Sequence, residues 1–238
     1  MDRRTRTILI VDKSTAMRYY HGMLLTRLEY AVLSAASPEE ALMIMERTMP
    51  SCVITGRLFP MMSGGDFIKK LKGTERTRFL PVIVLTGEKD DEGRKACLDL
   101  GCAAYLIKPV EPDHLYRAIQ AATEAMPRSN IRLGTSLKAV VGDAAGAEHA
   151  TMISEGGLFL RTPSPRPKDA VTPITVFIND RAIRATASVL YSHAPAAGAA
   201  GDPGMALKFV TISNEDRNFL RRFIHEQLTS DILPKKPA

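Results

Sequence analysis

The sequence contains no apolar run long enough to cross a membrane as a helix. Such a helix needs about 20 consecutive apolar residues, whereas the hydrophobic stretch that follows the basic N-terminal residues covers only residues 8–11. Hydrophobic residues make up 45% of the chain and charged residues 24%, a composition that is typical of globular proteins and excludes a largely disordered chain. We therefore expect a cytoplasmic protein that is not inserted in a membrane.

The sequence also has few cysteines. Cys52, Cys97 and Cys102 lie in apolar segments with no close metal-ligand pairing. We expect all three to be buried thiols in a reducing compartment, and we expect no bound metal.

Groups of residues typical of an active site are absent. No Ser/His/Asp or Cys/His set occurs at a useful spacing, so the sequence predicts a protein that is not an enzyme. The five histidines are scattered, and each is expected to be a surface or boundary residue: His21, His114, His149, His193 and His225.

Clustered positive charge is also lacking. The net charge is +6, of which residues 1–126 carry +2 (18 Lys/Arg, 16 Asp/Glu) and residues 127–238 carry +4 (14 and 10). An anionic partner is therefore more plausible for the second half, but no basic stripe or helix-turn-helix pattern is present. We expect no DNA binding.

The first half alternates short β-branched runs with amphipathic helical segments. This alternation predicts five strands and five helices in a doubly wound parallel sheet of flavodoxin-like order, (βα)5, whose ligand site lies at the carboxyl ends of the strands. In one helix, Ser37 is an N-cap and Pro38 the first helical residue. The expected strands are residues 7–11, 30–34, 51–55, 81–86 and 103–107.

From Pro127 onward the pattern changes to short strands separated by turn residues. We expect a small six-stranded antiparallel barrel closed by a C-terminal helix that Ser213 caps, with a hairpin turn at residues 179–180 and a low-complexity loop over residues 193–204. The predicted domains are residues 1–126 and 127–238. The expected strands are residues 137–141, 148–153, 157–162, 173–178, 182–191 and 205–212.

Four segments of the first half carry a recognisable pattern: ILIVD (8–12), RLFPMMSG (57–64), VIVLTG (82–87) and YLIKP (105–109). In this order they resemble the receiver domain of two-component response regulators, α/β proteins that accept a phosphoryl group on an aspartate with Mg²⁺ bound. The resemblance places Asp12, Thr86, Tyr105 and Lys108 on the functional positions of that family.

Two departures remove the expected chemistry. Gly56 stands at the position of the phosphate-accepting aspartate, and Lys13 at that of a second acid. With Arg57 and Lys108 nearby the pocket would be net positive and would repel Mg²⁺. We expect an unphosphorylatable domain in which Lys13 or Lys108 supplies the counter-charge of Asp12.

Other hydroxyls and acids nearby do not replace the acceptor. Thr55 and Ser63 have no adjacent base, and Asp66 is expected to be a solvated residue early in the third helix. Thr86 and Lys108 are present either because the fold tolerates them or because Thr86, Tyr105 and the face of the fourth helix, fifth strand and fifth helix still bind a protein partner.

The second half has two separated motifs, Arg128 and Arg132 in RSNIR, and Ser154-Glu155-Gly156-Gly157. Two arginines four residues apart can hold an anion or a guanine edge, and a glycine turn lets backbone N–H groups approach a ligand, although each motif alone is common on surfaces. Their order and spacing resemble the PilZ domain, which binds cyclic di-GMP through RxxxR and [D/N]xSxxG. The resemblance implies a ligand site at Arg128, Arg132, Ser154, Gly156 and Gly157.

The barrel also departs from its family. Met152 stands where the second motif has Asp or Asn, and losing one polar contact costs on the order of 1–3 kcal/mol. Two functions remain open: a cyclic di-GMP effector, or an adaptor in a motility, adhesion or chemotaxis assembly that does not bind the nucleotide. The sequence leaves open whether the protein is a homodimer.

Overall fold

The computed structural model describes residues 6–142, 148–193 and 203–232. They form two compact units, one made of residues 6–129 with 228–232 and the other of residues 130–142, 148–193 and 203–227. Among the described residues, no helix is long and apolar enough to span a membrane.

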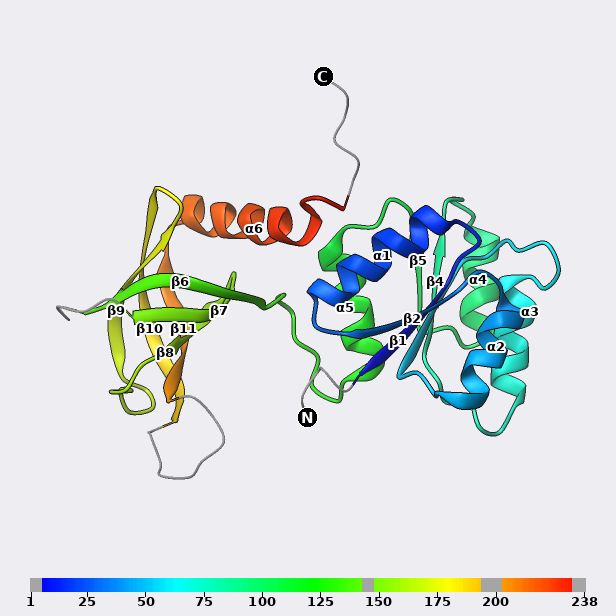
Figure 1. The fold of residues 1–238 in the computed structure, drawn as a ribbon, viewed down its shortest axis with the longest axis horizontal. Helices are drawn as coiled ribbons and strands as arrows, with labels where there is room; N and C mark the ends of the chain where they lie inside the picture. Colours follow the sequence, from blue (N-terminus) through cyan, green and yellow to red (C-terminus); the bar gives the residue numbers. More distant parts are fainter. Residues whose placement is uncertain (1–5, 143–147, 194–202, 233–238) are drawn as a thin grey trace, which may run out of the picture. The chain divides into compact units, whose positions relative to one another are not determined.

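The first unit is a five-stranded parallel sheet in the order β2-β1-β3-β4-β5. Figure 1 shows α1 and α5 on one face of this sheet and α2, α3 and α4 on the other. This confirms the predicted flavodoxin-like fold. The elements are β1 (Thr7–Val11), α1 (Thr15–Arg27), β2 (Ala31–Ala35), α2 (Pro38–Arg47), β3 (Cys52–Thr55), α3 (Gly64–Gly73), β4 (Val82–Thr86), α4 (Asp91–Asp99), β5 (Ala104–Ile107) and α5 (Pro112–Thr123).

Local sequence explains where these helices begin. The Ser37 hydroxyl accepts a hydrogen bond from the Glu40 N–H at 3.2 Å, and Pro38 occupies the first turn of α2. Ser63 caps α3 and Asp90 caps α4 in the same way. Each cap satisfies an N–H that has no partner within its helix.

Apolar residues on both faces of the sheet form the core. Leu9 and Val11 pack with residues of α2 and α3, including Ala41 and Phe67, in one fully buried cluster. Burying each large apolar side chain stabilises the fold by about 2 kcal/mol. The ends of β1, β3, β4 and β5 therefore meet at one firmly held edge, with Asp12, Gly56, Thr86 and Lys108 at or just beyond those ends.

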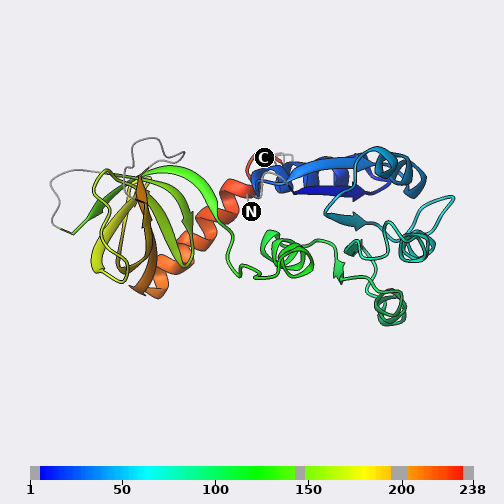
Figure 2. The same cartoon turned by 90° about the horizontal axis from the view of Figure 1, so that it is seen from below.

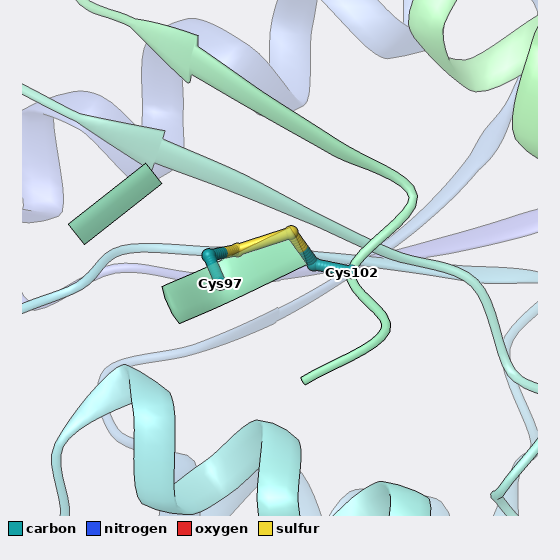
Figure 3. The surroundings of a disulfide bond; sticks show 2 residues. All are labelled: Cys97 and Cys102. Carbon is teal, nitrogen blue, oxygen red and sulfur yellow. A yellow bond between two sulfur atoms is a disulfide. The ribbon is translucent and has the colours of Figure 1, made fainter. Parts of the chain in front are cut away.

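Two cysteines are not free thiols. Cys97, in α4, and Cys102, just before β5, form a disulfide across a Cα–Cα distance of 5.7 Å (Figure 3). The expectation of three thiols is wrong for this pair, because the turn after α4 brings residues five apart in sequence within bonding reach. Cys52 is a buried free cysteine, and burial raises the pKa of its thiol to about 12.

The second unit is a closed antiparallel barrel in the order β10-β11-β8-β7-β6-β9, with α6 alongside it (Figure 2). This confirms the predicted six-stranded barrel with its C-terminal helix. Asn179, at φ 51°, makes the expected hairpin turn. The elements are β6 (Leu133–Val141), β7 (Glu148–Ser154), β8 (Gly157–Arg161), β9 (Val171–Ile178), β10 (Arg181–His193), β11 (Gly204–Ile212) and α6 (Asn214–Thr229).

The closing helix packs on the barrel core as its apolar face predicts. Ser213 Oγ accepts from the Asp216 N–H at 3.0 Å at its start. Leu220 joins the buried cluster, and Phe219 and Phe223 pack against it. Most of the predicted loop over residues 193–204 lies outside the described residues.

Candidate functional site

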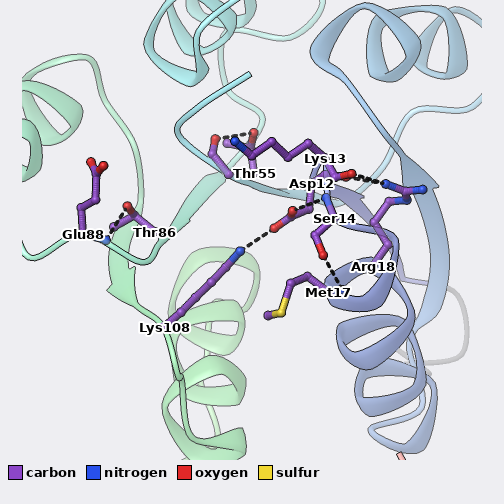
Figure 4. Close-up of polar contacts among 10 residues, drawn as sticks. Asp12, Lys13, Ser14, Met17, Arg18, Thr55, Thr86, Glu88 and Lys108 are labelled. Atoms are coloured by element: carbon purple, nitrogen blue, oxygen red, sulfur yellow. Dashed lines mark hydrogen bonds and ion pairs between the residues drawn. The ribbon is translucent and has the colours of Figure 1, made fainter. Parts of the chain in front are cut away.

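Asp12 lies just beyond β1, almost completely buried, and Lys108 is its counter-charge. The Lys108 ammonium forms an ion pair and a hydrogen bond with Asp12 Oδ2, and the Ser14 N–H donates to Oδ1 at 2.9 Å. Figure 4 shows the Lys108 side chain extending from the end of β5 to this carboxylate. Both carboxylate oxygens therefore have partners from the chain itself.

Lys13 does not make this ion pair and is exposed. Arg18 lies next to it, where its Nη1 donates to the Asp12 carbonyl at 2.7 Å and to the Lys13 carbonyl at 3.3 Å. The loop after β1 is thus surrounded by cationic groups. Among the described residues, no three Asp, Glu, His or Cys side chains gather as a metal site would require.

Gly56 follows β3, and its N–H donates to the Val11 carbonyl at 2.8 Å. A Cβ placed on it would lie 3.4 Å from the Phe59 ring and 3.8 Å from the Val11 oxygen. Its φ is outside the region that favours glycine. The backbone therefore does not require a glycine here, and a small shift of Phe59 would admit a side chain.

The threonine and serine hydroxyls around the pocket already have local partners. Thr86 is buried, and its Oγ1 accepts from the Glu88 N–H at 3.1 Å, as Figure 4 shows. The Thr55 hydroxyl donates to the Gly56 carbonyl at 3.0 Å. Ser63 caps α3 and donates to Asp66, which is exposed as expected. The Tyr105 hydroxyl is buried.

Sequence reasoning missed a cluster beside this pocket. Arg57, directly after Gly56, forms ion pairs with Glu88 and with Asp90, the N-cap of α4. The hydrogen bond to Asp90 raises the pKa of Arg57, and the pKa of Asp90 is lowered by the Gly93 N–H and then by Arg57. The sequence did contain a signal for this cluster: the segment after β4 is rich in acids, and α4, which follows it, contains a glycine, Gly93.

His21 is buried in α1, which corrects its assignment as a surface or boundary residue. Desolvation is the main cause that lowers its pKa to about 4, and the charge of Lys108 lowers it further. Its Nδ1 is buried and has no hydrogen-bond partner in the described part of the chain. The imidazole is therefore neutral at neutral pH.

In the barrel, the turn between β7 and β8 is closely packed through its glycines. The Ser154 hydroxyl donates to the Gly157 carbonyl at 3.0 Å, and the Phe209 N–H donates to the Gly156 carbonyl at 2.9 Å. A Cβ on Gly157 would lie only 2.0 Å from the Leu207 carbonyl oxygen. Only glycine fits at position 157, because β11 backbone occupies the space of any side chain.

The segment that carries the arginines reaches this turn through Asn130. A Cβ on Gly156 would lie 3.0 Å from Asn130 Nδ2, and Ile131 is buried next to it in sequence. Arg132 is half-buried in the same unit. Arg128 belongs to the first unit, where its N–H donates to Gln120 Oε1 at 3.2 Å.

Two neighbouring rows of side chains face outward from the barrel beside the turn. Between them lies the row Ile153, Leu158, Leu207 and Val189, which is buried in the core. Since side chains alternate along a strand, the rows on either side point outward. One row is Ser154, Gly157, Lys208 and Ser188, and the other is Met152, Phe159, Ala206 and Tyr191.

The second of these rows is apolar and aromatic. The rings of Phe159 and Tyr191 are 6.4 Å apart, and His193 lies 5.4 Å beyond Tyr191. Met152 is thus at one end of an outward-facing aromatic strip and not in the barrel core. A polar residue at position 152 would point to the same side as Ser154.

The acid within the turn is held by the closing helix. Glu155 Oε1 and Oε2 accept hydrogen bonds from Arg221 Nε and Nη2 at 3.0 and 2.8 Å. Arg217 Nη1 donates to the Glu155 carbonyl at 3.3 Å. The turn therefore carries no uncompensated negative charge, and α6 is attached to it.

Comparison with known proteins gives both halves a family. Residues 8–120 match the response regulator receiver domain and residues 127–226 match the PilZ domain. An uncharacterized 14.6 kDa protein of Leptolyngbya boryana is 32% identical over 120 residues, which are 50% of this chain and 92% of that protein.

A second relative, the phosphate regulon transcriptional regulatory protein PhoB of Pseudomonas aeruginosa, is 28% identical over 116 residues, 49% of this chain and 51% of that protein. The chain thus spans about half the length of that regulator. A response regulator receiver domain protein of Clostridium thermocellum, known as a crystal structure, is 31% identical with a TM-score of 0.47, over 50% of this chain and 94% of that one.

Both family matches agree with the folds of the two units and with the positions of their motifs. The chain is a signalling protein that contains a response regulator receiver domain followed by a PilZ domain.

Proposed function

We propose that this chain is a cytoplasmic, non-enzymatic cyclic di-GMP effector. Its barrel binds the dinucleotide at the β7–β8 turn and the two arginines of the RxxxR segment. Its receiver domain takes up no phosphate and serves as a protein-interaction module. The two parts of the proposal rest on different residues and are tested separately.

The observation that carries the ligand proposal is the packing of the turn. Gly156 lies against Asn130, so the turn of the SxxG motif lies beside the RxxxR segment, as a ligand that contacts both motifs requires, and Gly157 fixes the turn against the Leu207 carbonyl of β11. Arg132 supports the proposal, because its cation can oppose a phosphate or a guanine edge.

The outward-facing rows support the same ligand. Lys208 is exposed in the row that contains Ser154 and Gly157, where it adds positive charge beside the turn. Phe159 and Tyr191 offer aromatic faces on which a base can stack. Such a surface compensates in part for the polar group that Met152 does not supply.

Isothermal titration calorimetry with cyclic di-GMP tests the ligand proposal. We expect binding by the wild type, and a loss of at least about tenfold in affinity for Arg128→Ala and for Arg132→Ala. Arg184→Ala, an exposed arginine of β10, is the matched control and should bind as the wild type does. No heat at about 100 µM protein would reject the ligand and favour the adaptor function.

The receiver proposal rests on the charges of its pocket. Gly56 offers no carboxylate, and Lys108 already neutralises Asp12. Incubation with acetyl phosphate and Mg²⁺, followed by intact mass measurement, should leave the wild type unmodified. The double variant Gly56→Asp/Lys13→Asp restores an acceptor and a second acid, so it should gain one phosphoryl group. A phosphoryl adduct on the wild type would overturn this part.

The proposed partner face is formed by α4, β5 and α5. Leu98 on α4 and Ile107 on β5 are large apolar residues that are nearly half exposed. Sedimentation velocity will show whether the partner is a second copy. A dimer that Leu98→Asp/Ile107→Asp converts to monomer would identify this face, whereas a monomeric wild type leaves the face to a different protein.

A further inference from the structure

Arg57 connects two loops of the receiver domain that are not adjacent in sequence. It follows β3, yet its guanidinium contacts the loop after β4, with Nη2 at 3.0 Å from Glu88 Oε2 and Nη1 in an ion pair with Asp90 Oδ2. Its side chain is 29% exposed, so the ion pairs are only partly screened by water. One cation thus holds two acids of the same loop.

A gap in α4 makes this contact possible. A Cβ added to Gly93 would lie 1.9 Å from Arg57 Nη1 and 2.5 Å from Asp90 Oδ2. Any side chain at position 93 would therefore occupy the place of the guanidinium. Glycine is a poor residue for a helix, and its presence in α4 is explained by the space that Arg57 needs.

The loop between β4 and α4 is held at both ends by the same set of contacts. The Glu88 N–H donates to Thr86 Oγ1 at 3.1 Å, and the Gly93 N–H donates to Asp90 Oδ1 at 3.0 Å. Asp90 therefore caps α4 with one oxygen and binds Arg57 with the other. Arg57, Glu88, Asp90 and Gly93 form a single unit, which we name the Arg57 clamp.

We infer that the Arg57 clamp holds the β4–α4 loop and the first turn of α4 in one conformation by an internal cation. The α4 part of the proposed partner face is then always presented and does not wait for a phosphoryl group. This inference goes beyond the proposed function and is independent of ligand binding by the barrel.

A double-mutant cycle tests the geometry of the clamp by calorimetric melting of the full chain. In the wild-type background, Gly93→Ala displaces the guanidinium of Arg57. The stability gained from the higher helix propensity of alanine is therefore offset by the stability lost with the clamp. In the Arg57→Ala background the added Cβ meets only the Asp90 carboxylate, whose Oδ2 is no longer held by Arg57 and needs only a small shift. There, Gly93→Ala should raise the receiver melting temperature by about 4 °C.

Gly73→Ala in α3 is the matched control, because a Cβ there would meet nothing within 4 Å. Its effect should be the same with and without Arg57. The inference is overturned if Gly93→Ala raises the melting temperature equally in both backgrounds, since Arg57 would then not occupy the gap.

Hydrogen exchange measures directly how firmly the clamp holds the β4–α4 loop and the first turn of α4. Amides of residues 87–94 should exchange about fivefold faster in Arg57→Ala than in the wild type. Arg76→Ala, which removes an exposed arginine of the α3–β4 segment, should leave them unchanged. Acetyl phosphate with Mg²⁺ should not alter wild-type protection. Unchanged exchange in Arg57→Ala, or protection gained with the phosphodonor, would each overturn the inference.

Discussion

The pocket of the receiver domain and the turn of the barrel both depart from their families, but they do so in different ways. In the receiver, Asp12 is paired with Lys108, while Arg57 is paired with Glu88 and Asp90. Charged groups in and beside the pocket are thus bound to each other. In the barrel, one side chain, Met152, differs, and the closely packed glycine backbone is present.

The difference shows that the effect of losing one functional residue depends on whether its neighbours keep their arrangement. Around Gly56 the charged neighbours are paired with one another, so replacing the glycine alone would leave Asp12 bound to Lys108 and would supply no second acid at Lys13. Around Met152 the turn, with its hydrogen bond from the Ser154 hydroxyl to the Gly157 carbonyl, and the outward aromatic strip are still present. Four predictions test this contrast, in order of decreasing expected effect.

In the barrel, the largest effect is expected at Gly157, which packs against the backbone of β11. Gly157→Ala places a Cβ against the Leu207 backbone, which cannot move without separating β8 from β11. We expect the barrel to lose at least about 3 kcal/mol of unfolding free energy, measured by calorimetry. Gly156→Ala meets only the Asn130 side chain and should cost about 1 kcal/mol or less. Equal effects of the two substitutions would show that the close approach is not rigid.

In the receiver domain, the buried His21 should make the stability depend on pH. Because its pKa is about 4 in the folded chain against about 6.5 when unfolded, the unfolded state binds more protons between these values. The contribution of neutral His21 to the free energy of unfolding is complete above about pH 6.5. It decreases as the pH falls toward 4, by about 3 kcal/mol in total.

Urea unfolding of the full chain at pH 7 and pH 4.5 measures this loss. His21→Leu should remove that part of the pH dependence, while His114→Gln, at an exposed position of α5, should retain it. A His21→Leu variant as acid-sensitive as the wild type would mean that the buried imidazole is not responsible.

Met152, which replaces the Asp or Asn of the motif, should weaken cyclic di-GMP binding without abolishing it. Met152→Asp supplies a polar group on the side of Ser154, and we expect cyclic di-GMP to bind about tenfold more tightly, as one added polar contact gives. Met152→Leu, which adds no polar group, should bind as the wild type does. Calorimetric titration distinguishes them, and equal affinities would place residue 152 outside the ligand contact.

The smallest effect concerns the ion pair between Glu155 and Arg221. Arg221 is exposed, so Arg221→Ala should lower barrel stability by only about 0.5 kcal/mol. It also leaves an uncompensated acid beside an anionic ligand, which should weaken cyclic di-GMP about threefold.

Adding Glu155→Gln to Arg221→Ala should restore the ligand affinity, and Arg222→Ala, also exposed on α6, should have no effect. If Glu155→Gln does not restore affinity, α6 acts on the turn by packing and not by charge.

Much of both halves could be predicted because the relevant patterns are local. Residues such as Ser37 with Pro38, and the hairpin at Asn179, act within a few positions of themselves. Alternation of apolar runs placed every strand to within a few residues, and the largest error was the start of β6, four residues before its predicted start. The motif at Ser154–Gly157 was likewise visible in its own residues.

The amino-acid sequence by itself determined the two folds, the motifs and their departures, because hydrophobic period, caps and turn residues are properties of neighbouring positions. Only the tertiary structure decided which charges meet. Arg57 and Asp90 are 33 residues apart, Glu155 and Arg221 are 66, and Asp12 and Lys108 are 96. Such pairs depend on strand order and on the space left by single glycines, and no local pattern encodes either one.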